Sequence, residues 1–274
     1  SYGIVSRSGV VAMGSSTDVI GPFAKNVADI GIVMDVMAGY DGLDSTMIIR
    51  ADSYVVENSD VKGVKIGVVK EYFEEGINPK VKELILSSIE KLKQAGAIIE
   101  EVSLPSLPLA LAVYYVIVPA ELSSNLSRYD GQRYGYSDRN AKNLDESYEL
   151  SRSSGFGAEA KRRIMIGTHV LSSGYYDAYY KKAQTVRTKI INEFTSAFEK
   201  YDFLVGPTAP DTEDPLKMYL TDIMTVAANL AGIPAISLPC GRVHDMPVGL
   251  QIMADQCKDK ELLDLAKTFE GLQS

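Results

Sequence analysis

One segment of the sequence constrains the fold more than any other. Val64 to Val69 is a short run rich in β-branched residues, and the Asn78-Pro79 pair after it is a typical helix start. Apolar residues then recur at helical spacing until Gly96, and a second apolar run, Ala97 to Val102, follows. A strand, a helix and a strand at this spacing form a βαβ unit. We therefore expect the two strands to be parallel and the crossover to be right-handed.

The same alternation continues along most of the chain. The spacing predicts helices over 26–38, 179–198, 222–230 and 258–269, and strands over 203–205, 235–238 and 249–253. Helices that alternate with short apolar strands favour an α/β fold, in which a mixed sheet is sandwiched by helices. Residues 107–174 depart from this pattern because they are mainly helical and polar. We expect them to form a helical cap or insert on the sheet.

Composition narrows the classes of function. The chain carries 28 Lys and Arg against 36 Asp and Glu, a net charge of −8, and lacks the basic excess of a direct nucleic-acid binder. Two cysteines, Cys240 and Cys257, are too few for a disulfide framework, which favours a reducing, cytoplasmic location. We expect both side chains to lie in the core. The most apolar stretch, Leu107 to Ala120, is shorter than the roughly 18 residues of a membrane helix. We therefore expect no contact with a membrane.

Side chains for metal or nucleophilic catalysis are sparse. His169 lies in an apolar run typical of a core residue, and His244 lies in a predicted hairpin loop. The sequence has no cysteine–histidine cluster with metal-ligand spacing, no glycine-rich phosphate loop and no GxSxG turn that presents a serine. Four tyrosines between 175 and 180 are of the kind that stack on RNA bases. Given the acidic charge, we expect instead a helix that packs these rings beneath the cap.

Several local sequences are more specific. They are YGIVSRSGVVAMGSSTDVIGP at 2–22, KRRIMIGTHVLSSGYYDAYY at 161–180, VGPTAP at 205–210, NLAGIPAISLPCG at 229–241 and PVGLQIM at 247–253. Together they resemble the amidase signature family over nearly the whole chain. Two stretches favour one group within it, the A subunits of glutamyl-tRNA(Gln) amidotransferases: ELSSNLSRYDGQRYGY at 121–136 and SSGYYDAYYKKAQ at 172–184.

The resemblance implies that an amide is hydrolysed by a Ser–cis-Ser–Lys triad. The lysine acts through the bridging serine to deprotonate the nucleophilic serine, which attacks the amide carbonyl. In the family these residues precede the part that matches Tyr2, so the triad is expected upstream of this chain. Residues 1–274 are then the C-terminal part of a single amidase-like domain. We assign no catalytic residue here, and we interpret Ser6, Ser15 and Ser16 as loop hydroxyls.

The resemblance also implies a substrate and partners. Members of this group hydrolyse the side-chain amide of glutamine, and the ammonia passes to a B subunit. That subunit uses ATP and Mg²⁺ to amidate glutamate misacylated on tRNA(Gln). The expected partners are therefore subunits B and C, with the misacylated tRNA held mainly by the partner. No metal or cofactor is expected in this chain.

Three positions match the family's glutamine contacts: Tyr114, Arg163 and Asp222. An arginine suits the α-carboxylate of glutamine, and an aspartate suits its α-ammonium. The alternative for each is a structural role, as a surface ion pair or a core phenol. The chain is shorter than the family between Pro210 and Asp214, so the register of Asp222 depends on the match of DPLKMYLTD.

Two other functions stay open at this level. One is a stand-alone amidase that acts on a small amide, and the other is a non-catalytic scaffold. An arginine and an aspartate that suit a zwitterion favour glutamine over a generic amide. A glycine- and serine-rich signature and a lysine upstream would exclude the scaffold.

Overall fold

A computed structural model describes residues 1–50, 53–74, 76–211 and 222–273. The chain divides into two compact units. The first consists of Ser1–Ser8, Val19–Leu111 and Arg187–Ser274, and the second of Gly9–Asp18 and Ala112–Val186. The sheet belongs to the first unit.

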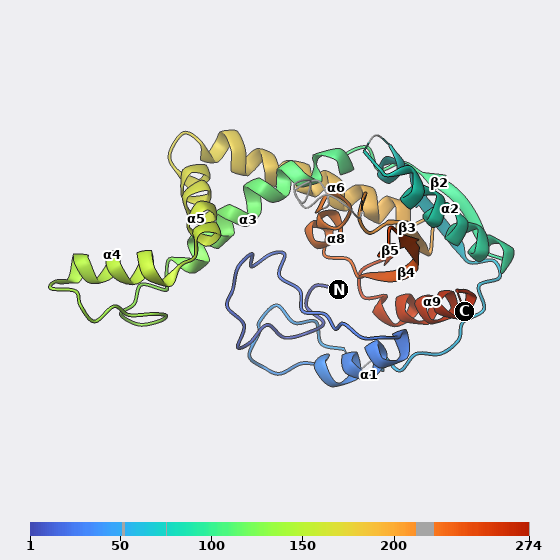
Figure 1. Cartoon of the computed structure of the whole chain (residues 1–274), viewed down its shortest axis with the longest axis horizontal. Coiled ribbons are helices and arrows are strands. Elements are labelled where there is room, and N and C mark those ends of the chain that lie inside the picture. Colours follow the sequence, from blue (N-terminus) through green and yellow to red (C-terminus); the bar gives the residue numbers. More distant parts are fainter. Residues whose placement is uncertain (51–52, 75, 212–221, 274) are drawn as a thin grey trace. The chain divides into compact units, whose positions relative to one another are not determined.

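Five strands form one mixed sheet in the order β2-β1-β3-β5-β4. β1 (Lys65–Val69) is parallel to β2 (Ile98–Val102) and to β3 (Phe203–Pro207). β5 (Met246–Ala254) runs antiparallel to β3 and to β4 (Ala235–Val243). Helices cover the sheet (Figure 1), which confirms the predicted α/β fold with a mixed sheet.

The predicted βαβ unit is confirmed in detail. α2 (Pro79–Gln94) connects β1 to the parallel strand β2. Asn78 caps the helix, because its side-chain oxygen accepts a hydrogen bond from the Lys80 backbone N–H at 2.9 Å, and Pro79 occupies the first position. Gly96 follows the helix with a φ of 108°, a left-handed conformation that favours glycine.

Different helices cover the two faces of the sheet. Among the described residues, the other α-helices of this unit are α1 (Val27–Met37), most of α6 (Lys182–Phe198), α8 (Val226–Ala231) and α9 (Asp259–Leu272). On β3 and β5, Val205 and Ile252 belong to the core formed with α1, α2 and α9, whereas the alternate residues Leu204 and Met253 are buried outside it. α6 and α8 lie on the side of β5 and β4 away from α9 (Figure 1).

The helix predicted over 26–38 has the expected bounds but not the expected inner face. The apolar spacing of this helix predicts that Val33 faces inward together with Val27 and Met34. Val27 and Met34 are buried, whereas Val33 is 37% exposed, so its predicted burial is wrong. Gly31 faces inward instead. A Cβ atom on Gly31 would lie 2.4 Å from the carbonyl oxygen of Tyr54, so the chain passes directly over this glycine.

The second unit is helical. It contains most of α3 (Ala110–Leu126), together with α4 (Leu144–Gly155), α5 (Ala158–Leu171) and the π-helical turn η3 (Tyr176–Lys181) that leads into α6. The helical character predicted for 107–174 is therefore seen. Its role as a cap or insert on the sheet stays a prediction.

The prediction that the most apolar stretch is too short for a membrane helix is wrong. The 3-10 turn η2 (Leu107–Leu109) and α3 form one stretch, Leu107–Leu126, of 20 residues with a mean hydropathy of 1.5. Pro119 lies inside α3 and does not end it. By length and composition this stretch is able to cross a membrane, and the core helices of soluble proteins share the same length and composition.

Candidate functional site

Two of the three predicted glutamine contacts touch each other in the second unit. Arg163, on α5, donates from Nη1 to the hydroxyl of Tyr114, on α3, at 3.1 Å. It also donates from Nε to Oε1 of Glu159, one turn earlier, at 2.7 Å. The Arg163 side chain is 25% exposed. Among the described residues these contacts use two of its five N–H donors, which leaves three for a ligand.

A close helix crossing brings Arg163 and Tyr114 together. Gly167 lies one turn after Arg163 on α5, and a Cβ atom there would lie 1.8 Å from the carbonyl oxygen of Pro119 on α3. The same atom would lie 2.8 Å from the Cβ of Ser123. Only a glycine lets the two helix backbones approach this far. The crossing therefore sets the distance between the phenol and the guanidinium.

The charge around Arg163 is positive. Glu159 accepts from Arg162 at 2.8 and 2.7 Å and from Arg163 at 2.7 Å. The hydrogen bond from Arg162, followed by that from Arg163, lowers the pKa of Glu159 to about 2. Burial by itself lowers the pKa of Arg163, but its hydrogen bonds to Glu159 and Tyr114 outweigh this effect and raise it. One carboxylate thus lies between two cations, a setting that suits an additional carboxylate from a ligand.

Asp222, the third predicted contact, lies in the first unit. It begins the 3-10 turn η5 (Asp222–Met224), and its carbonyl oxygen accepts from the backbone N–H of Thr225 at 3.1 Å. The buried side chain of Gln251 donates to the carbonyl oxygen of Met224 at 2.8 Å and so ties this turn to β5. The assignment of Asp222 to glutamine stays a prediction. The shortened stretch predicted between Pro210 and Asp214 falls largely outside the described residues.

Two of the serines declined as nucleophiles have structural partners. Ser16 donates from its backbone N–H and its hydroxyl to the carboxylate of Glu121, at 2.9 and 2.5 Å. Asn125 donates to the hydroxyl of Ser15 at 2.7 Å. These contacts hold the loop Gly9–Asp18 on α3, which confirms the interpretation as loop hydroxyls. Sequence reasoning missed Glu121 and Asn125, although their spacing places both on one face of a helix.

The predictions for His169 and the tyrosine cluster are wrong. His169 is exposed, and its ring centroid lies 4.2 Å from that of Tyr175. Tyr175, Tyr176 and Tyr179 are 43%, 40% and 49% exposed, so these rings do not pack beneath a cap. The π-helical turn Tyr176–Lys181 changes the register of this stretch, and Tyr175 stacks on Tyr179 along the surface.

The part of the chain that the structure describes offers no further candidate for a metal site or a reactive thiol. No group of three or more His, Cys, Asp or Glu side chains within it is arranged to hold a metal ion. Cys240 and Cys257 are free thiols, and burial raises the pKa of Cys240. Cys240 is buried as predicted, whereas Cys257 is only partly buried.

Comparison with known proteins decides the family. The family model described as Amidase matches residues 1–263. The chain belongs to the amidase family. The resemblance seen in the sequence is therefore confirmed.

Curated relatives within the family are similar over nearly all of this chain. The A subunit of glutamyl-tRNA(Gln) amidotransferase from Sulfurihydrogenibium sp. (strain YO3AOP1) is 49% identical over 281 residues. That of Halothermothrix orenii is 50% identical over 279 residues. The matches take in 99% and 98% of this chain but only 58% of each relative. The chain thus spans less than two thirds of the length of these family members.

Solved structures agree with the family. The A subunit of glutamyl-tRNA(Gln) amidotransferase from Thermotoga maritima superposes with a TM-score of 0.78 at 39% identity, over 98% of this chain and 56% of that one. The peptide amidase from Stenotrophomonas maltophilia superposes with a TM-score of 0.73 over 98% of this chain and 56% of its own. At 24% identity the second likeness shows the fold alone.

Proposed function

We propose that this chain is part of the glutamine-hydrolysing subunit of an amidotransferase that converts Glu-tRNA(Gln) to Gln-tRNA(Gln). Relatives that share about half of its residues carry the name of that A subunit. The observation that carries the proposal is the partly buried Arg163, held against Tyr114 with three donors left for a substrate. Such a cation is suited to an amino acid and has no purpose for a generic neutral amide.

Each of the three residues has a distinct role in this proposal. Arg163 binds the α-carboxylate of glutamine, because its planar fork matches two carboxylate oxygens. Tyr114 holds the guanidinium in place through the 3.1 Å hydrogen bond. Asp222 receives the α-ammonium. The side-chain amide of the bound glutamine is then presented to the Ser–cis-Ser–Lys triad that the family resemblance implies.

The proposal includes partners. Ammonia passes to a B subunit that holds ATP, Mg²⁺ and the misacylated tRNA, and a C subunit completes the assembly. The net charge of −8 supports a tRNA held mainly by the partner, because phosphate binding needs basic surfaces. We also propose that the enzyme is cytoplasmic. The 274 residues by themselves are expected to release no ammonia from glutamine.

Arg163 has a matched control in the neighbouring Arg162. Both arginines bond to Glu159, but the side chain of Arg162 is 45% exposed, whereas that of Arg163 is 25% exposed and also bonds to Tyr114. In the complete enzyme, Arg163→Ala loses a charge-assisted hydrogen bond worth about 1.5–3 kcal/mol. We expect kcat/KM for glutamine to fall roughly ten- to hundredfold, while ammonia-dependent amidation of the tRNA is unchanged. Arg162→Ala is expected to keep both activities near those of the wild type.

Three outcomes contradict the proposal. Equal losses of glutamine- and ammonia-dependent amidation in Arg163→Ala would make this residue structural. A glutamine analogue without its α-carboxylate is expected to be a poor substrate that Arg163→Ala hardly worsens, so a further large loss would exclude the carboxylate contact. Rapid hydrolysis of small neutral amides by the complete protein, without preference for glutamine, would identify a stand-alone amidase.

A further inference from the structure

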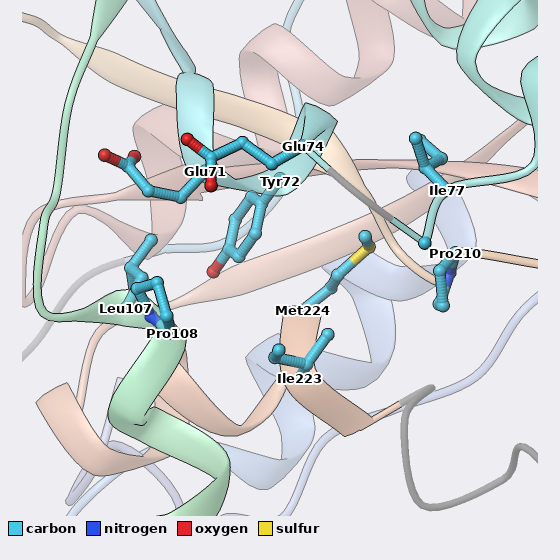
Figure 2. Close-up of a pocket in the computed structure, with 10 residues that line it drawn as sticks. Glu71, Tyr72, Glu74, Ile77, Leu107, Pro108, Pro210, Ile223 and Met224 are labelled. Atoms are coloured by element: carbon cyan, nitrogen blue, oxygen red, sulfur yellow. The ribbon is translucent and has the colours of Figure 1, made fainter.

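A cavity of about 540 Å³ lies at the carboxyl ends of the parallel strands in the first unit. Its lining comes from the segments that follow these strands. Tyr72 follows β1, Leu107 and Pro108 follow β2, and Pro210 follows β3 (Figure 2). The volume is within the range of small-molecule sites, about 300–1,000 Å³.

The position of the cavity in the sheet is one where α/β proteins bind ligands. The chain leaves β1 through α2 to reach β2 on one side, and later returns through α6 to β3 on the other side of β1. Two right-handed crossovers in opposite directions place their helices on opposite faces of the sheet. The connections therefore lie on opposite faces of the sheet, and a crevice forms between the carboxyl ends of the neighbouring strands β1 and β3.

A buried hydroxyl in this cavity lacks a partner. Tyr72 is 3% exposed, and its hydroxyl has no hydrogen-bond partner among the described residues. Figure 2 shows the hydroxyl directed into the space between Pro108 and Met224. Buried hydroxyls are normally hydrogen-bonded, so an orphan at a cavity wall points to a ligand that supplies the acceptor.

The ring of Tyr72 is held in place by β3. A Cβ atom on Gly206 would lie 2.5 Å from Cδ2 of the ring, so the glycine creates the space in which the ring rests. Burial, with a smaller effect of the Glu71 charge, raises the pKa of Tyr72 far above its ordinary value. The hydroxyl therefore stays protonated and acts as a donor at neutral pH.

The charge at the cavity selects against anions. Glu71 lines the cavity, and its carboxylate is fixed by the Ser103 hydroxyl at 2.5 Å and the Leu104 backbone N–H at 2.9 Å. Glu74 adds a second carboxylate at the exposed rim. None of the described lining residues is cationic, and the remaining side chains are apolar, among them Ile77.

We propose that this cavity is a binding site for a small, neutral, mainly apolar molecule that presents a carbonyl oxygen to the Tyr72 hydroxyl. Aromatic ketones and amides without a carboxylate belong to this class. Glutamine does not, because its α-carboxylate would face Glu71 and Glu74 without a cation. The site is therefore additional to the proposed glutamine contacts, and its test does not depend on them.

Three probes of similar size separate the effects of the hydrogen bond, the apolar contact and the charge on binding. Acetophenone has a carbonyl acceptor, ethylbenzene lacks it, and benzoate adds a negative charge. Their dissociation constants are measured by saturation-transfer NMR titration with the 274-residue chain. We expect acetophenone to bind about two- to tenfold more tightly than ethylbenzene, as one neutral hydrogen bond allows, and benzoate not to bind. In Tyr72→Phe, acetophenone is expected to weaken to the level of ethylbenzene, whose own binding stays unchanged.

A second variant tests the location without disturbing the buried ring. Pro108→Trp, at the exposed rim, is expected to weaken acetophenone and ethylbenzene together by obstructing the cavity. The proposal fails if wild type and Tyr72→Phe bind acetophenone equally, or if benzoate binds as well as acetophenone. It also fails if no probe binds the folded wild-type chain, because the orphan hydroxyl would then be only a packing defect.

Discussion

Replacing Gly167 by alanine tests the crossing of α3 and α5. The added Cβ would lie 1.8 Å from the carbonyl oxygen of Pro119, whereas a carbon and an oxygen in contact are about 3.3 Å apart. One helix must therefore move by about 1.5 Å. Overpacking of this kind costs about 1–3 kcal/mol, with the upper end expected because the atom met is backbone. The better helix propensity of alanine returns about 1 kcal/mol, so we expect a net destabilisation of about 1–2 kcal/mol.

Gly271 is the matched control. It is also helical, in α9, but a Cβ atom there meets nothing within 4 Å. Gly271→Ala is therefore expected to stabilise the protein by up to about 1 kcal/mol. Urea unfolding followed by far-ultraviolet circular dichroism measures both changes. Opposite signs support the close crossing, whereas a Gly167→Ala protein that is stabilised like Gly271→Ala would refute it.

The same substitution has a functional consequence. A shift of about 1.5 Å is large compared with the 3.1 Å hydrogen bond between Arg163 and Tyr114, and misplacement by about 1 Å can cost roughly a hundredfold in rate. In the complete enzyme we expect Gly167→Ala to lower kcat/KM for glutamine and to spare ammonia-dependent amidation. Loss of both activities together would show that the crossing supports the fold but not a glutamine site.

Three further predictions concern local contacts. The pKa of Glu159 is lowered from 4.5 to about 2, so its stabilising contribution is present above about pH 4.5 and lost as the pH falls toward 2. The wild type should melt at a higher temperature than Glu159→Gln, and this difference should shrink as the pH falls through this range. A difference that stays constant with pH would contradict the ion pairs. Asn78→Ala should cost about 1 kcal/mol in urea unfolding and Asn78→Ser much less, because serine also caps helices. Gly206→Ala should lower the free energy of unfolding by about 1–3 kcal/mol, because its Cβ meets the Tyr72 ring. Adding Tyr72→Leu to that variant should relieve part of this cost. If the losses of the two single variants simply add in the double variant, the predicted contact is contradicted.

Local chemistry made much of the fold predictable. The Asn78-Pro79 start of α2 and the left-handed Gly96 after it need only neighbouring residues, so both were correct from the sequence. The hairpin predicted around His244 is also present. His244 and Asp245 have φ values of 46° and 63°, which suit the two-residue turn between β4 and β5.

Errors occurred where a neighbour distant in sequence decides burial. Periodicity gives Val33 and His169 an apolar setting, yet both are exposed because another element covers a different side of each helix. On α1 that side contains Gly31, against which the Tyr54 carbonyl packs. Periodicity defines a stripe, but the partner segment determines which part of the stripe is buried.

The sequence by itself determined the strand–helix alternation, the family and the residue types suited to a zwitterionic substrate. Only the tertiary structure placed Arg163 against Tyr114, 49 residues earlier, because Gly167 lets the α5 backbone approach Pro119. Likewise, Tyr72 reads as an ordinary core residue until three strand ends surround its hydroxyl with apolar groups. Composition and motifs specify which groups a chain carries, whereas contacts between distant segments decide which of those groups are buried, paired or left for a ligand.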